Sequence, residues 1–308
     1  MAEQTPDEAL LKEIESVAAR LAGETGRMLM DSFGKQTAVD FKEKGKRGPV
    51  TELDRMAEEH LRRGIGARFP EHSVVGEENV PTERPGAFVW VLDPLDGTAN
   101  YINGLPFYAV SVGVLRQGRP VAGAIFVSVG HWGTPAVYHA REGGGARVND
   151  TPLAQVPPPD GSRLAVVPIR VRRGMRRPEG LAWEARTLGS IAAEMAYVAA
   201  GVFQYAFFRS PRAWDVAAGL VLVREAGRSA FAVSPVESNA RRWLPMQQFP
   251  APEGPDALAR LQGWSAPLLV GEPRAVNLLL EGLRRPSLWA TVSGWLRGRG
   301  QPPPAGQK

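Results

Sequence analysis

The stretch from Phe88 to Tyr101, FVWVLDPLDGTANY, constrains the fold more than any other part of the chain. It begins with an unbroken apolar run, Phe88 to Leu92, whose β-branched and aromatic residues are typical of a strand buried on both faces. We expect this strand to stop at Asp93, because a proline follows and because Asp96 with the next glycine favours a turn. Two carboxylates that face one point repel each other unless a cation lies between them, and Mg²⁺ selects oxygen ligands. The stretch therefore predicts the edge of a metal site.

The residues that follow favour a phosphate beside that metal. The Leu95 carbonyl would add a further oxygen ligand, and Gly97 allows the backbone to approach an anion closely. If Asn100 begins a helical turn, the free N–H groups of residues 97–99 would hold a phosphate, with the Thr98 hydroxyl beside the metals. The alternative is a hairpin with an acidic turn, which explains the Asp–Gly pair but not the whole hexapeptide.

Composition excludes several classes of site. The 308-residue chain is 44% hydrophobic and contains no cysteine, so it can bury a large core but has no disulfide, catalytic thiolate or thiolate metal site. Its 37 Lys and Arg against 32 Asp and Glu give a net charge of +5, which does not demand a nucleic-acid partner. The acidic N-terminus and the lack of an apolar run near the roughly 20 residues that span a bilayer predict a cytoplasmic protein with no transmembrane segment.

Three further acids lie at the ends of predicted elements. Asp54 falls in the first turn of a helix that begins near Thr51. Glu77 and a second glutamate follow a short strand that ends in glycine, so that one of them can face a site. Asp215 falls in the first turn of an Ala- and Val-rich helix, residues 213–227. An ordinary helix-start acid is the simpler interpretation of Asp54 and of Asp215, and the metal interpretation depends on all these acids together.

The other predicted elements form the scaffold. An amphipathic helix begins near Thr5, which we expect to be its cap, and residues 41–50 read as an exposed loop. Residues 109–115 and 121–129 predict a hairpin of buried strands. We expect residues 241–264, which are rich in proline, to be an irregular surface insertion.

The best domain boundary is the proline-rich stretch of residues 151–161. It divides the chain into an N-terminal α+β half, residues 1–150, which carries most metal ligands, and a C-terminal α/β half, residues 151–283, which carries Asp215. Residues 284–308 predict a basic, flexible tail.

Two segments of the C-terminal half are candidates for ligand contacts. Gly189 and Ser190 precede a small-residue helix whose N-terminus can hold a substrate oxygen. Arg170 to Arg177 packs five arginines into eight residues, which favours a solvated loop and leaves phosphate or RNA recognition as the minority alternative.

Four motifs taken together resemble the inositol monophosphatase family of Mg²⁺-dependent, lithium-sensitive phosphatases. They are VTELD at residues 50–54, GEE at residues 76–78, DPLDGT at residues 93–98 and WDVAAG at residues 214–219, in matching order and spacing. The similarity runs from about Leu10 to Gly227 and more loosely beyond.

The resemblance implies an α+β fold, a layered α/β/α/β/α sandwich that usually forms homodimers, and a phosphomonoester hydrolase with two or three Mg²⁺ ions. It assigns the metal ligands to Glu77, Asp93, the Leu95 carbonyl, Asp96 and Asp215. The same resemblance gives Asp54 and Thr98 the orientation of the attacking water, assisted by Glu77. Substrate contacts fall on Gly97, Thr98, Gly189, Ser190 and Asp215.

One departure concerns the substrate. Members that hydrolyse inositol phosphates carry a glutamate shortly before the Trp–Asp pair, to bind sugar hydroxyls, whereas Phe208 occupies that place here. We therefore expect a small phosphorylated polyol, sugar or related metabolite. The alternatives are a 3′(2′),5′-bisphosphate nucleotidase, a histidinol-phosphatase, or a mainly non-catalytic partner of RNA or the transcription machinery.

Overall fold

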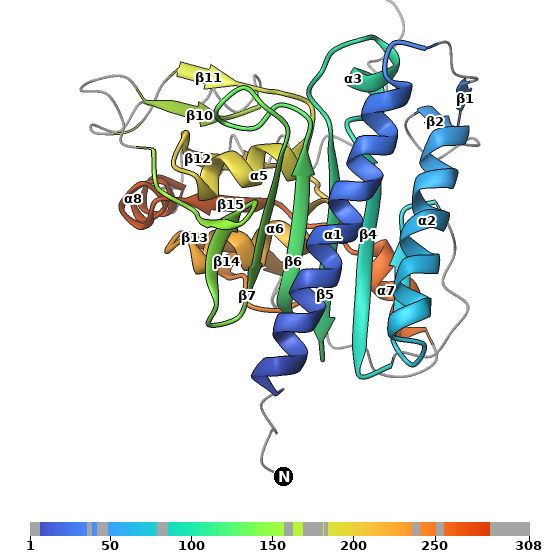
Figure 1. Ribbon diagram of the computed structural model, residues 1–308. Coiled ribbons are helices and arrows are strands. Elements are labelled where there is room, and N and C mark those ends of the chain that lie inside the picture. The colour runs from blue at the N-terminus through green and yellow to red at the C-terminus, as the bar shows by residue number, and fades with distance from the viewer. Residues whose placement is uncertain are drawn as a thin grey trace, which may run out of the picture.

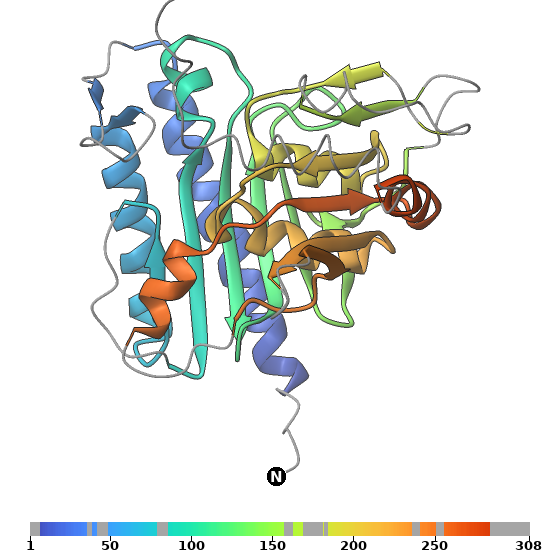
Figure 2. The ribbon, with the colours of Figure 1, turned by 180° about the vertical axis from the view of Figure 1, so that it is seen from behind.

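The computed structural model shows five layers, α/β/α/β/α, and confirms the predicted sandwich (Figures 1 and 2). Helices α1 (Glu8–Ser32) and α2 (Glu52–Arg68) cover the outer face of a seven-stranded sheet, and α5 (Ile191–Ala199) and α6 (Ala213–Glu225) fill the space between that sheet and a six-stranded one. Helix α8 (Pro273–Leu283) covers the far side of the six-stranded sheet. The structure describes residues 7–35, 39–41, 49–78, 86–156, 163–168, 181, 184–235, 241–250 and 256–283.

The seven-stranded sheet has the strand order β3-β4-β5-β6-β7-β8-β9, with only β3 and β4 parallel. The predicted hairpin is confirmed, and its two strands join through Gln117 and Gly118, which both have positive φ. The strands are Ser73–Gly76, Phe88–Asp96, Ala109–Arg116, Arg119–Val127, Ala136–Arg141, Gly145–Val148 and Thr151–Pro152.

Two predictions near the N-terminus are corrected. Helix α1 is capped by Asp7, whose side chain accepts a hydrogen bond from the Ala9 N–H, while Thr5 lies outside the described residues. The predicted loop of residues 41–50 is partly paired, because β1 (Val39–Phe41) and β2 (Pro49–Thr51) form an antiparallel ladder. Residues 42–48 lie outside the described part of the chain.

The central helix α6 packs closely on the seven-stranded sheet because two strand glycines face it. A Cβ at Gly113 would lie 2.6 Å from the Ala217 Cβ, and one at Gly123 would lie 2.7 Å from the Ala218 Cα. Most of α6 is buried, which its Ala- and Val-rich sequence allows, since a helix between two sheets has little face left for water. These contacts set the distance between α6 and the strands β5 and β6.

The six-stranded sheet has the order β11-β10-β12-β15-β13-β14. The expected irregular insertion at residues 241–264 is wrong in two places. Strand β14 (Arg241–Pro245) pairs with β13, and α7 (Ala257–Gly263) packs near β3. The sequence of β14 contains arginines and a proline and lacks the apolar alternation that predicts a strand. Its extended conformation depends on pairing with β13. The remaining strands are β10 (Leu164–Val166), β11 (Glu184–Arg186), β12 (Phe203–Phe208), β13 (Ser229–Pro235) and β15 (Leu268–Gly271).

The largest hydrophobic cluster draws on both sheets and both central helices, so the two halves share one core. The division of the chain into two domains at residue 150 stays a prediction. The predicted tail, residues 284–308, lies outside the described part. Among the described helices, none is both long and apolar enough to cross a bilayer.

Candidate metal centre

The end of strand β4 brings Asp93 and Asp96 to the same site. The strand does not stop at Asp93 as expected but continues to Asp96, and its register against β5 shifts between the two. Asp93 pairs with Ser111 and Asp96 pairs with Ala109, so β4 has one residue more than its partner over this interval. Such a bulge lets two residues at odd spacing face one side, which a regular strand forbids. The proline between them fits here because the ladder is already interrupted.

Asp215 reaches the same point from the first turn of α6. Its carboxylate accepts a hydrogen bond from the Arg212 N–H at 2.7 Å, and the Ser111 hydroxyl donates to the Trp214 carbonyl at 2.9 Å, which ties this turn to β5. One carboxylate oxygen from each of Asp93, Asp96 and Asp215 lies within 4.8 Å of the others. The predicted acids from the two halves of the sequence are therefore brought together.

The electrostatics of this cluster favour a bound cation. Burial raises the pKa of Asp93 and of Asp215 well above the usual range, and the neighbouring carboxylates raise it further. Burial also raises the pKa of Asp96 to about 6, although hydrogen bonds from the start of α5 oppose the shift. None of the three forms an ion pair with a described Lys, Arg or His. A buried, all-oxygen set without a cationic partner fits a hard divalent ion such as Mg²⁺.

Glu77 follows β3, which runs parallel to β4, and its backbone N–H donates to the Leu92 carbonyl at 3.2 Å. Its charge contributes to the raised pKa of both Asp93 and Asp215, so the carboxylate acts on the cluster electrostatically. Its role as a ligand stays a prediction, as does that of the Leu95 carbonyl.

Asp54 and Thr98 lie together beside the cluster. The Thr98 Oγ1 is 3.2 Å from the Asp54 Oδ1 and 3.0 Å from the Leu95 carbonyl oxygen. Asp54 is buried in the first turn of α2, and Thr98 is the first residue of α3 (Thr98–Ile102). That helix starts two residues earlier than the expected start at Asn100, because Gly97, with φ of 100°, turns the chain into it.

The start of α5 fixes Asp96 in place. The Ser190 hydroxyl donates to the Asp96 Oδ2 at 2.8 Å, and the Ala192 N–H donates to the same oxygen at 2.6 Å. Gly189 has φ of 84° and allows the close approach of the Asn100 side chain, which donates to the Leu188 carbonyl. The predicted substrate contacts of Gly189 and Ser190 stay predictions; in this structure the serine supports a carboxylate of the cluster.

Glu58 is a supporting residue that the sequence reasoning missed. It is fully buried on α2, and its carboxylate accepts hydrogen bonds from the Arg62 Nε at 2.7 Å and the Glu78 N–H at 2.9 Å. A Cβ at Gly76 would lie 2.3 Å from the Glu58 Oε1, so the glycine makes room for this contact. Glu58 thus holds the backbone just after Glu77 and lies against Gly76 just before it. Its position one helical turn after Asp54 was the available signal.

Glu194 is a second residue that was missed. It is buried on α5, accepts a hydrogen bond from the Leu188 N–H at 2.5 Å, and has its pKa raised to about 7 by burial. It fixes the turn that precedes Ser190. A single acid inside an otherwise apolar helix was its signal in the sequence.

The sequence and the fold are similar to those of known proteins. The family model described as "Inositol monophosphatase family" matches residues 10–246. The chain belongs to the inositol monophosphatase family. It is 34% identical over 235 residues to "Fructose-1,6-bisphosphatase/inositol-1-monophosphatase" of Aquifex aeolicus, with 70% of this chain and 83% of that protein covered. It is 32% identical over 223 residues to "Nus factor SuhB" of Escherichia coli, with 69% and 82% covered.

Among solved structures, the extragenic suppressor protein suhB of Bartonella henselae superposes with a TM-score of 0.68 at 24% identity. The match covers 89% of this chain and 99% of that one, and it supports the shared fold.

Replacing Glu58 by Gln is expected to weaken Mg²⁺ binding by roughly tenfold, because a neutral amide cannot hold both the Glu78 N–H and the Arg62 guanidinium. Isothermal titration calorimetry with MgCl₂ measures this. Glu59→Gln is the matched control, since Glu59 is exposed on the same helix. Equal Mg²⁺ affinity in the two variants would show that Glu58 has no positioning role.

The stabilisation of the protein by Mg²⁺ is expected to grow with pH. Asp96 has an ordinary pKa of 3.8 and a folded-state pKa of about 6, so in the metal-free protein its stabilising contribution is complete below about pH 4 and is lost as pH rises through about 6. Mg²⁺ binds the deprotonated carboxylates, so its effect on Tm is larger at about pH 8 than at about pH 5.

Thermal melts with MgCl₂ and with EDTA at both pH values measure the difference. Asp215→Asn, which removes a member of the cluster, is expected to reduce the Mg²⁺-dependent rise in Tm at the higher pH. A rise in Tm that is the same at both pH values in the unmodified protein would refute the raised pKa values.

Proposed function

We propose that this chain is a Mg²⁺-dependent phosphomonoester hydrolase that acts on a small phosphorylated polyol, sugar or related metabolite. The observation that carries the proposal is the buried cluster of Asp93, Asp96 and Asp215, without cationic partners among the described residues, beside the hydrogen-bonded pair of Asp54 and Thr98. When bound, Mg²⁺ supplies a Lewis acid for phosphate oxygens and lowers the pKa of water. The names of relatives, "Inositol-1-monophosphatase" among them, support a phosphatase.

In this proposal Asp54 and Thr98 handle the proton of the attacking water. The Thr98 hydroxyl, which lies within hydrogen-bond distance of Asp54, accepts a hydrogen bond from the water while it donates its own proton toward the carboxylate. Asp54 thereby becomes the acceptor at the end of a two-bond path. Its place in the first turn of α2 favours the anion that this role requires.

The other acids hold the reacting groups in fixed positions. Asp96 is fixed by Ser190 and by the Ala192 N–H, and Asp215 is fixed by the Arg212 N–H. Side chains that are already held by hydrogen bonds need no reorganisation when substrate arrives, which favours an in-line attack on phosphorus.

The substrate is not assigned to inositol phosphate. Phe208 lies in β12 and is 4% exposed, packed into the core where family members that bind inositol place a glutamate. Without that carboxylate, hydroxyl recognition has to come from other residues, so we retain bisphosphate nucleotidase and histidinol-phosphatase activities as alternatives. The homodimer and the cytoplasmic location stay predictions.

Purified protein with MgCl₂ is expected to release phosphate from at least one member of a panel of sugar, polyol and nucleotide monophosphates. Asp54→Asn is expected to lower kcat by roughly 10²- to 10⁴-fold, because it removes the proton acceptor. Asp93→Asn is expected to abolish the Mg²⁺-dependent release of phosphate. Asp31→Asn, an exposed position on α1, serves as the control with unchanged kcat. An inactive protein across the whole panel would contradict the proposal.

A second candidate is a mainly non-catalytic partner of RNA or the transcription machinery, favoured by relatives named "Nus factor SuhB". The arginine-rich segment that prompted it, residues 170–177, lies outside the described residues. For this candidate, single-stranded RNA is expected to bind in a salt-sensitive way that survives Asp93→Asn, measured by gel shift. Absence of binding at low salt would dismiss RNA recognition.

A further inference from the structure

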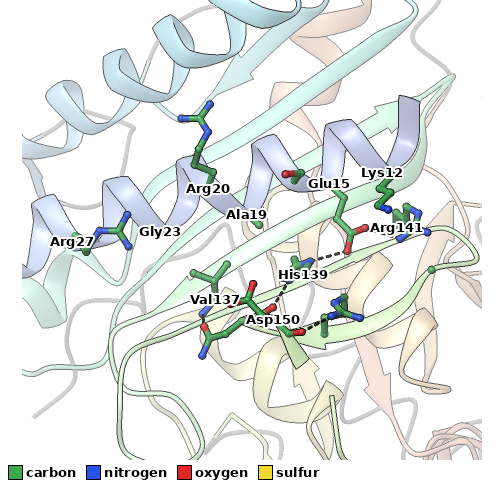
Figure 3. A pocket seen from close by; sticks show the side chains of 14 residues that line it. Lys12, Glu15, Ala19, Arg20, Gly23, Arg27, Val137, His139, Arg141 and Asp150 are labelled. Atoms are coloured by element: carbon green, nitrogen blue, oxygen red, sulfur yellow. Dashed lines mark hydrogen bonds and ion pairs between the residues drawn. The ribbon is translucent and has the colours of Figure 1, made fainter. Parts of the chain in front are cut away.

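A groove of about 750 Å³ lies between α1 and the strands β7 and β8 (Figure 3). Helix α1 covers one face of the seven-stranded sheet, and α6, which carries Asp215, packs on the other. The groove is therefore separated from the acidic cluster by the sheet. Its volume is within the range of roughly 300–1,000 Å³ that is typical of small-molecule sites.

The alternation of β7 places three side chains in this groove. Ala136, Tyr138 and Ala140 are buried, and Val137, His139 and Arg141 between them are half-buried and line the groove. The facing side of α1 contributes Ser16 and Ala19, whose small side chains leave space over the strand, and Gly23, where the lack of a side chain lets Val137 approach. The groove is thus a product of small residues on the helix opposite long polar residues on the sheet.

Glu15 organises one wall. It is buried, and it accepts hydrogen bonds from His139 at 2.7 Å and from Arg141 at 2.9 Å. Burial alone raises the pKa of Glu15, but the bonds from His139 and Arg141 outweigh burial and hold its pKa below the usual value. The negative charge of Glu15 is therefore compensated by its bonded partners in the groove wall, so it does not repel an anion in the groove.

His139 bridges the two sides of this wall. Its Nδ1 faces the Glu15 carboxylate, and its Nε2 faces the Asn149 carbonyl oxygen at 2.7 Å. The ring therefore links Glu15 on α1 to the turn after β8.

Several basic side chains of the groove have no carboxylate partner. Lys12 and Arg27 are exposed on α1 and make no ion pair with any described residue, and Arg147 donates to the Asp150 carbonyl. Lys12 and Arg27 are separated by about 22 Å along the helix, by its rise of about 1.5 Å per residue. Figure 3 shows Arg27 at one end of the groove and Lys12 at the other, with Val137 and His139 between them.

We propose that this groove binds an elongated organic phosphate that carries two or more phosphate groups. Lys12 and Arg27 contact phosphate oxygens toward the two ends, and Ala19 and Val137 contact the organic part between them. A compact inorganic anion would reach only one end, and a groove of about 750 Å³ fits a small molecule rather than a nucleic-acid duplex. The site does not depend on phosphatase activity at the acidic cluster.

The test is isothermal titration calorimetry with 1,10-decanediol bisphosphate, a linear probe with a phosphate at each end, in EDTA, where the acidic cluster has no metal to attract phosphate. One molecule of this bisphosphate is expected to bind per chain, more weakly as salt rises. Lys12→Gln and Arg27→Gln are each expected to weaken binding roughly five- to tenfold, which corresponds to loss of one charge-assisted contact. Arg274→Gln, at an exposed position on α8, is the matched control and is expected to bind as the unmodified protein does.

Two further arms separate the alternatives. Asp93→Asn is expected to leave binding of the bisphosphate in EDTA unchanged, which excludes the acidic cluster as the binding site. The proposal is overturned if the bisphosphate does not bind, if the groove variants bind it as tightly as Arg274→Gln, or if single-stranded RNA binds through Lys12 and Arg27 at least tenfold more tightly than the bisphosphate. Lys12 and Arg27 are exposed, so circular dichroism melts are expected to show folded variants.

Discussion

The closeness of three carboxylates within 4.8 Å of one another, with Asp93 and Asp215 buried and Asp96 half-buried, is the constraint on which the rest of the structure depends. Charges removed from water destabilise a fold unless protons or a cation compensate them, and no described cationic side chain pairs with this cluster. The protein holds each acid from behind with a donor: the Leu95 N–H bonds Asp93, Ser190 bonds Asp96, and the Arg212 N–H bonds Asp215. Because the donors bind one side of each carboxylate, the remaining oxygens are left for a metal ion. Hydrogen bonds of this kind orient the ligands of metal sites in proteins.

The layered architecture explains how the acids from distant parts of the sequence meet. Because α5 and α6 lie between the sheets, their first turns reach the end of β4, which carries Asp93 and Asp96. Gly113 and Gly123 set how closely α6 approaches, since any side chain there would push the helix away. The packing of α6 on the sheet therefore also sets the position of Asp215 in the acidic cluster. A substitution that moves α6 is expected to change the affinity for metal.

Local sequence singled out the acids because each lies at the end of an element with a clear signal, as with Asp54 in a helix start and Asp93 after an apolar run. It failed where geometry depends on a partner. The bulge that aligns Asp93 and Asp96 exists only against β5, and edge strand β14 exists only against β13. Glu58 was missed because its contact with the Glu78 N–H joins residues 20 apart. Contacts of that kind follow from tertiary packing, which propensity does not encode.

The net charge of +5 understates how positive the surface is. Among the described residues, six acidic side chains are buried and no lysine or arginine is. Burying acids removes negative charge from the surface and leaves basic side chains such as Lys12 and Arg27 facing solvent. The helices on the outer face of the seven-stranded sheet also expose acids such as Asp31 and Glu59, so the attraction for a phosphorylated ligand is local to the groove, where Lys12 and Arg27 lie.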